Sequence, residues 1–162
     1  MEYVSNEKED YYLFLGGSLG AEKINELAKE FFEEFKIPTI LVSGDSDITT
    51  NGEFKVYPFL DNQLEVMSKA KAIITRGGAS TLVECEVLSK KTIVIPSPNV
   101  VADHQYFNGL EMEKKGGFKV IREEDVDAKK TFSTLESMVE NSNQEKISSC
   151  KIIIEKIKEI NE

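Results

Sequence analysis

The sequence contains no tryptophan, a single histidine and two cysteines. Because His104 is the one histidine, the chain cannot build a three-histidine zinc site. Cys85 and Cys150 lie 65 positions apart and form no CxxC pair, which argues against a disulfide framework and against a cysteine zinc site. We therefore expect two reduced thiols, as in a cytoplasmic protein, and no bound metal.

Long apolar runs and an excess of positive charge are also missing. No stretch approaches the ~20 apolar residues of a transmembrane helix, and residues 1–10 lack the basic and apolar regions of a signal peptide. The 20 Lys and Arg are outnumbered by 29 Asp and Glu, which gives a net charge of −9. An acidic domain of this kind is a poor candidate for binding nucleic acid or anionic lipid.

The chain does have the composition of a globular protein, with 162 residues, 40% of them hydrophobic and 30% charged. Short apolar runs predict strands at residues 11–15, 39–42, 54–59, 72–75, 91–95 and 118–121. Segments with helical spacing predict helices at 21–35, 64–70, 79–88 and 103–115. Because the apolar runs show no clean alternation, we expect both faces of the sheet to be covered, as in parallel α/β sheets.

The sequence thus predicts an α/β fold with a Rossmann-like, doubly wound parallel sheet and helices on both faces. We expect a polar leader at 1–10 and a single domain at 11–162, with a helical tail from about residue 125. Ligands of such sheets bind outside the carboxyl ends of the strands. The loops of interest therefore follow Leu15, Val42, Val56, Thr75 and Ile95.

A first glycine-rich loop, GGSLG at 16–20, lies between the first expected strand and helix. Glycines let backbone N–H groups approach a ligand closely, and the following helix N-terminus favours an anion. The spacing matches neither GxGxxG nor a Walker A loop. A phosphate site and a plain tight turn are both compatible with this segment.

A second loop, RGGASTLVE at 76–84, repeats the arrangement of strand, glycine turn and helix start. Ser80 and Thr81 could cap the helix, or they could bind phosphate oxygens beside the free N–H groups. Glu84 lies one turn further on, and a carboxylate there suits a neighbouring diol because it accepts two hydroxyl hydrogen bonds. Two such loops in one sheet indicate a diphosphate flanked by a ribose.

A third polar segment, DHQYFN at 103–108, starts the fourth expected helix. Its Asp, His, Gln and Asn side chains offer donors and acceptors suited to sugar hydroxyls, although a lone histidine is also common as a surface or cap residue. We expect the charged stretches 114–115 and 122–125 to be solvated surface.

Four segments occur in order: GGSLGA at 16–21, PFLDN at 58–62, RGGASTLVE at 76–84 and DHQYFN at 103–108. Together they resemble the C-terminal half of the MurG glycosyltransferases, over roughly residues 11–122. Those enzymes have the GT-B fold and transfer GlcNAc from UDP-GlcNAc to undecaprenyl-linked muramyl-pentapeptide, converting lipid I to lipid II in peptidoglycan synthesis. The resemblance implies a GT-B C-terminal domain that binds the UDP-GlcNAc donor.

The resemblance also implies residue roles. Leu60 would hold the uracil through its backbone, and Glu84 would bind the ribose hydroxyls. Arg76 stands where the family has arginine, with a structural role as the alternative. The remaining substrate-binding residues would be Gly17, Ser18, Gly78, Ala79, Ser80 and Thr81 around the diphosphate, and Asp103, His104, Gln105 and Asn108 around the GlcNAc. No metal or other cofactor is implied, because helix N-termini and hydrogen-bond donors stabilise the leaving UDP.

One departure from the family bears on activity. Family members carry an N-terminal Rossmann-like domain with the lipid-acceptor site, the membrane-binding patch and the general base, whereas only about ten residues precede the first strand here. We therefore expect the donor-binding half, which has no catalytic residue of its own and catalyses little or no transfer alone. The complete enzyme would be peripheral on the cytoplasmic face of the membrane.

Several alternatives stay open. The chain could be an excised domain, which is favoured because its GGSLGA and DHQ motifs resemble those of bacterial MurG enzymes. It could also be a natural subunit of a two-subunit lipid-linked GlcNAc transferase. A UDP-sugar hydrolase or epimerase would need acid and base residues in a complete cleft. A non-enzymatic nucleotide-sugar sensor or assembly module would bind the UDP-sugar without a partner half.

Overall fold

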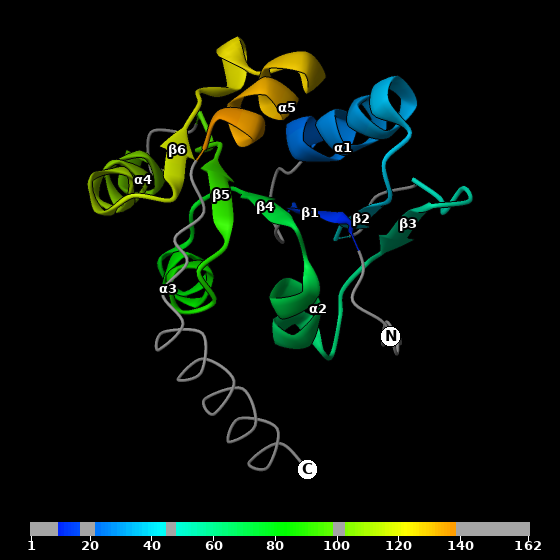
Figure 1. Ribbon diagram of the computed structural model, residues 1–162, viewed down its shortest axis with the longest axis horizontal. Coiled ribbons are helices and arrows are strands. Elements are labelled where there is room, and N and C mark those ends of the chain that lie inside the picture. The colour runs from blue at the N-terminus through cyan, green and yellow to red at the C-terminus, as the bar shows by residue number, and fades with distance from the viewer. Residues whose placement is uncertain (1–9, 17–21, 45–47, 99–102, 139–162) are drawn as a thin grey trace.

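The computed structural model describes residues 10–16, 22–44, 48–98 and 103–138. Its centre is a six-stranded sheet with the order β3-β2-β1-β4-β5-β6, and every pair of neighbouring strands is parallel (Figure 1). The strands are β1 (Tyr12–Leu15), β2 (Thr39–Val42), β3 (Phe54–Tyr57), β4 (Ala72–Thr75), β5 (Lys91–Val94) and β6 (Phe118–Val120). The predicted parallel sheet is confirmed, and the third strand ends earlier than expected.

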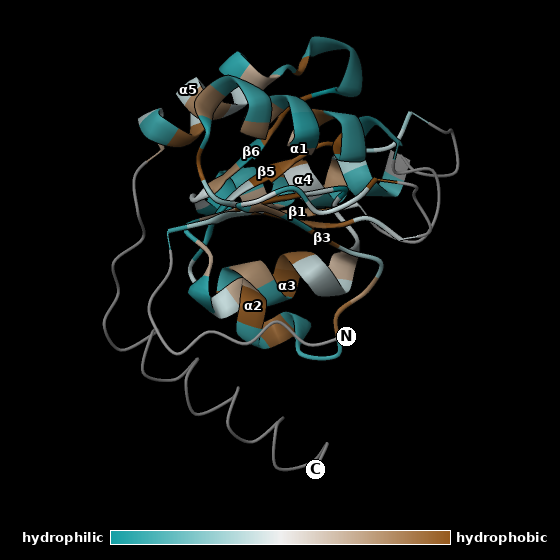
Figure 2. Ribbon diagram, turned by 90° about the vertical axis from the view of Figure 1, so that its right-hand side faces the viewer, coloured by the Kyte–Doolittle hydropathy of each residue, from teal (hydrophilic) through white to brown (hydrophobic). Residues whose placement is uncertain are grey.

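Helices cover both faces of this sheet. They are α1 (Glu22–Phe35), α2 (Gln63–Lys69), α3 (Ala79–Val87), α4 (Asp103–Lys115) and α5 (Ala128–Ser137), with the short 3-10 helix η2 (Glu123–Asp125) before α5. In Figure 2, α1 and α5 lie above the sheet, and α2 and α3 lie below it. No described helix is long and apolar enough to cross a membrane.

The continuous apolar strands divide their side chains between two cores. In β1, Leu13 and Leu15 face the core formed with α2, α3 and α4, whereas Tyr12 and Phe14 face the core formed with α1 and α5. This follows from the period of two along a strand. Because both faces are covered, no alternation of apolar and polar residues is needed, and all four residues of β1 are buried.

α1 and α5 are joined by aromatic packing. Phe31 is fully buried and lies 5.2 Å from the ring of Phe35, which stacks at 4.5 Å on Phe132 of α5. Asp127 caps α5, because its Oδ1 accepts a hydrogen bond of 2.7 Å from the Lys130 N–H. A helical segment therefore follows the last strand, within the region where the sequence predicts a helical tail.

The chain changes direction in the sheet between β1 and β4. The strands β1 to β3 extend to one side of this point and β4 to β6 to the other. All carboxyl ends share one edge, where backbone bonds continue beyond the strands: Ile95 N–H donates to Thr75 at 2.8 Å, and Ile121 N–H donates to Val94 at 2.9 Å. Open α/β sheets bind ligands at such an edge, so the loops that leave it position the candidate site.

Candidate functional site

The N-terminus of α3 lies at this edge, directly after β4. Gly78 is the N-cap residue, with φ −59° and ψ 136°, and it makes no side-chain cap bond. The first intrahelical bond runs from the Leu82 N–H to the Gly78 carbonyl at 3.0 Å, so the N–H groups of residues 79–81 have no partner within the helix. Such N–H groups, together with the helix dipole, favour an anion.

Ser80 and Thr81 lie inside this first turn and do not cap it. Gly78 occupies the N-cap position instead, so the alternative that Ser80 or Thr81 caps the helix is wrong. Ser80 is exposed and Thr81 half-buried. Together with Ala79, they place two hydroxyls and three helix-start N–H groups in one turn.

The two glycines of the turn differ in their surroundings. Gly77 has φ +100°, and a Cβ there would lie 2.7 Å from Val94 Cγ1 and 3.2 Å from the Gln105 carbonyl oxygen. The turn therefore lies tightly against β5 and α4, and only glycine fits. A Cβ at Gly78 would meet no atom of the described residues within 4 Å, so within this part of the chain the backbone in front of α3 has room for a ligand.

Glu84 lies three residues after Thr81 and four after Ser80, and therefore on the same side of α3 as these two hydroxyls. It is half-buried, and burial raises the pKa of its carboxyl group above the ordinary value. The neighbouring Cys85 is fully buried, and burial raises the pKa of its thiol to about 12. Glu84 is thus a desolvated hydrogen-bond acceptor, whereas Cys85 is an inert core residue.

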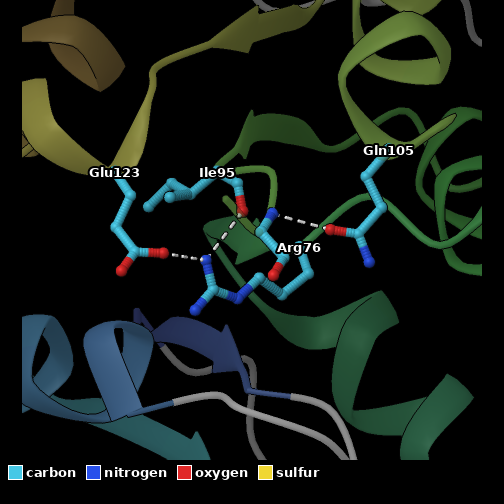
Figure 3. Close-up of polar contacts among 5 residues, drawn as sticks. Arg76, Ile95, Gln105 and Glu123 are labelled. Carbon is cyan, nitrogen blue, oxygen red and sulfur yellow. Dashed lines mark hydrogen bonds and ion pairs between the residues drawn. The ribbon is translucent and has the colours of Figure 1, made fainter. Parts of the chain in front are cut away.

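Arg76 is buried at the end of β4, with 7% of its surface exposed. Its Nη1 lies 2.7 Å from Glu123 Oε2 and 3.4 Å from the Ile95 carbonyl oxygen (Figure 3). The prediction of solvated surface at 122–125 is confirmed for Arg122, Glu124 and Asp125, which are exposed, and is wrong for Glu123, which is half-buried and pairs with the buried Arg76. The Arg122 guanidinium lies 4.0 Å from the centre of the Tyr106 ring.

Gln105 is half-buried in the first turns of α4. Its Oε1 accepts a hydrogen bond of 2.8 Å from the Ser97 N–H (Figure 3). Since a backbone N–H can only donate, the amide oxygen must face Ser97, and the NH2 group remains as a donor for a ligand. Of the other predicted sugar contacts, His104 is exposed and Asn108 half-buried, while Asp103 is the first residue of α4.

Leu60 lies between β3 and α2, with its side chain 8% exposed and packed into the core with α2, α3 and α4. The side chain is occupied by packing, which leaves the backbone for any ligand contact. Gly17 and Ser18 lie outside the described residues. Within the ranges that the structure describes, no group of three or more His, Cys, Asp or Glu side chains is placed to hold a metal ion.

Similarity to known proteins shows the family of this chain. The model of the glycosyltransferase family 28 C-terminal domain matches residues 12–162. The chain belongs to this family. Two curated relatives are the UDP-N-acetylglucosamine--N-acetylmuramyl-(pentapeptide) pyrophosphoryl-undecaprenol N-acetylglucosamine transferases of Oenococcus oeni and Thermotoga maritima. The first is 35% identical over 88% of this chain and 42% of its own length, and the second is 34% identical over 86% and 42%.

Solved structures show the same fold as this family 28 domain. MurG of Acinetobacter baumannii has a TM-score of 0.66 at 21% identity, over 96% of this chain and 51% of its own. The calicheamicin glycosyltransferase CalG4 has a TM-score of 0.70 at 12% identity, over 94% and 40%. The predicted family resemblance and GT-B fold are confirmed. The family 28 domain spans about two-fifths of the length of its curated relatives.

Proposed function

We propose that this family 28 domain is the UDP-GlcNAc-binding half of an inverting N-acetylglucosaminyltransferase. The observation that carries the proposal is the start of α3, where the first-turn N–H groups have no partner within the helix, a Cβ at Gly78 would meet no described atom within 4 Å, and Glu84 follows one turn on. The N-acetylglucosamine transferase activity for which the two curated relatives are named supports GlcNAc as the sugar.

Each part of the donor would have a matching group. The diphosphate would accept hydrogen bonds from the N–H groups of residues 79–81 and from Ser80 and Thr81, with the helix dipole favouring its charge. The ribose hydroxyls would donate to Glu84, and the Gln105 NH2 would donate to a sugar hydroxyl. Leu60 would contact the base through its backbone, and Gly17, Ser18, Asp103, His104 and Asn108 would complete the site.

The acceptor would be held by a second, N-terminal half, as the length of the relatives suggests. A base in that half would take the proton of the acceptor hydroxyl, whose oxygen would attack the anomeric carbon directly. The bond from that carbon to the diphosphate oxygen would break, and UDP would leave with the electron pair. The α3 N-terminus would stabilise the charge that develops there, without a metal. We place the complete enzyme at the cytoplasmic membrane face, where it would convert lipid I to lipid II.

Calorimetric titration of the chain with UDP-GlcNAc, UDP and GDP tests this function. We expect both uridine ligands to bind and GDP to bind at least about tenfold more weakly, because a backbone contact at Leu60 selects the smaller base. Equal affinity for GDP would exclude a uridine site, and an absence of binding would exclude a donor site that forms in this chain alone. Release of UDP from UDP-GlcNAc without an acceptor would favour a hydrolase instead.

A further inference from the structure

The Arg76 guanidinium connects the ends of three neighbouring strands. Arg76 itself directly follows β4, the Ile95 carbonyl that it contacts at 3.4 Å follows β5, and Glu123, at 2.7 Å, follows β6. Figure 3 shows the guanidinium between the carboxylate and the carbonyl. Each of these strand ends leads into a loop at the carboxyl edge, where the candidate site lies.

Further contacts continue this link towards the site residues. Gly77 follows Arg76 directly and lies against the Gln105 backbone, with a hypothetical Cβ 3.2 Å from its carbonyl oxygen. The Gln105 side chain in turn holds the Ser97 N–H at 2.8 Å. The β4–α3 turn, the loop after β5 and the start of α4 are thus interlocked, with Glu123 at the outer end.

The ion pair is well placed to keep this geometry fixed. Arg76 has 9% of its side chain exposed and Glu123 has 26%, so the pair is shielded from water and stronger than a surface pair. A charge-assisted bond of 2.7 Å is also directional. Without the Glu123 carboxylate, the buried guanidinium would lose its ion-pair partner at 2.7 Å, and we expect it to shift together with the adjoining backbone of Gly77.

We propose that Glu123 is a positioning residue for the nucleotide-sugar site: acting through Arg76, it holds the β4–α3 turn in the conformation that binds the diphosphate. Glu123 belongs to none of the four motif segments and is not among the residues assigned to the donor. The inference builds on the proposed function, since it concerns how tightly the α3 N-terminus binds its ligand.

Replacing Glu123 with Gln preserves the size of the side chain and removes the charge. We expect UDP to bind about fivefold more weakly to E123Q, in the range typical of residues that act on a site through neighbours. The matched control is E86Q. Glu86 also forms an ion pair between two elements, with Lys115 of α4 at 3.3 Å, and 32% of the Glu86 side chain is exposed. Glu86 lies near the far end of α3. We expect E86Q to bind UDP as the unmodified chain does.

Amide hydrogen exchange on the same proteins gives a readout that does not need the ligand. The Leu82 and Ser97 amides report on the site loops, because they donate to Gly78 and to Gln105, and the Leu88 amide, which donates to Glu84, reports on the far end of α3. In E123Q we expect Leu82 and Ser97 to exchange faster while Leu88 is unchanged. A purely structural role would accelerate all three and leave the UDP affinity of the folded protein intact.

A double-mutant cycle with R76M tests whether the effect passes through Arg76. In the R76M background, E123Q should change the UDP affinity less than twofold. Unchanged UDP affinity in E123Q, or unchanged exchange at Leu82 and Ser97, overturns the positioning role. If the unmodified chain binds no UDP, the proposed function fails, whereas the exchange rates still decide whether Glu123 orders the turn.

Discussion

Glu84 is a carboxylate held in an environment that disfavours its charge. Burial raises its pKa in the folded chain, so the folded state binds the proton more tightly than the unfolded state does. The stability linked to this group is fully present below the unfolded-state pKa of about 4.3 and is lost as the pH rises through the folded pKa. At neutral pH the unliganded domain therefore carries a charge that would be better solvated in the unfolded chain.

The first prediction follows for E84Q. We expect this variant to have a higher Tm than the unmodified chain at pH 7 and an unchanged Tm near pH 4, as measured by calorimetry. The same variant should bind UDP about tenfold more weakly, because the ribose hydroxyls lose a charged acceptor. A lower Tm at pH 7, or unchanged UDP affinity, would contradict the role assigned to Glu84.

At the scale of the element, the two glycines that directly precede α3 have different structural roles. A Cβ at Gly77 would collide with Val94 at 2.7 Å in a backbone with φ +100°, whereas a Cβ at Gly78 would meet none of the described atoms within 4 Å. The first glycine is therefore required by packing. The second is compatible with alanine in the unliganded fold, and its lack of a side chain matters for what approaches α3.

The second prediction contrasts these glycines. We expect G78A to change the free energy of unfolding by less than about 1 kcal/mol, since the cost at the cap and the gain from a stiffer unfolded chain nearly cancel. UDP affinity should fall at least about tenfold, because the new methyl group occupies space beside the first-turn N–H groups. G77A should instead destabilise the fold by about 2 kcal/mol or more. A G78A variant with full UDP affinity would place the diphosphate elsewhere.

The end of α3 allows a prediction on stability alone. Ser89 has φ 55°, the left-handed conformation that favours glycine, and among the described residues its buried Oγ has no hydrogen-bond partner. We expect S89G to raise the free energy of unfolding by about 1 kcal/mol, measured by urea denaturation. The control is S133G in the exposed middle of α5, where the same change should lower it by about as much. Destabilisation by S89G would show that the hydroxyl has a partner.

These elements also show what could be predicted from the sequence. The strands and the first four helices begin and end within two residues of the predicted positions, because continuous apolar runs and helical spacing are local signals. The pairing of Arg76 with Glu123 was missed, since it joins residues 47 positions apart and depends on the β6 end lying beside β5. Nothing in a run of four charged residues distinguishes the one that turns inward.

At the scale of the whole molecule, the carboxyl edge of one sheet would supply one wall of the proposed binding site. Every donor group assigned above comes from that edge, while sites for small molecules usually enclose most of the ligand. The chain also covers about 42% of its curated relatives. We therefore expect donor binding and sugar transfer to be separable properties, the second needing groups from outside this edge.

The last prediction concerns that separation. We expect the chain to bind UDP yet to transfer no GlcNAc from UDP-GlcNAc to lipid I, because Glu84, the carboxylate that follows the first turn of α3, would be engaged with the ribose rather than free to act as the base. Fusion to the N-terminal part of the Oenococcus oeni relative should produce turnover of lipid I, which is measured as the release of UDP. E84Q in the same fusion should lower kcat/KM about tenfold, mainly through KM, since a ribose contact is made equally before and during the reaction. Turnover of lipid I by the unfused chain would mean that the base lies within these 162 residues. A fusion that binds UDP and cleaves UDP-GlcNAc to UDP without forming a lipid product would assign the chain to hydrolysis.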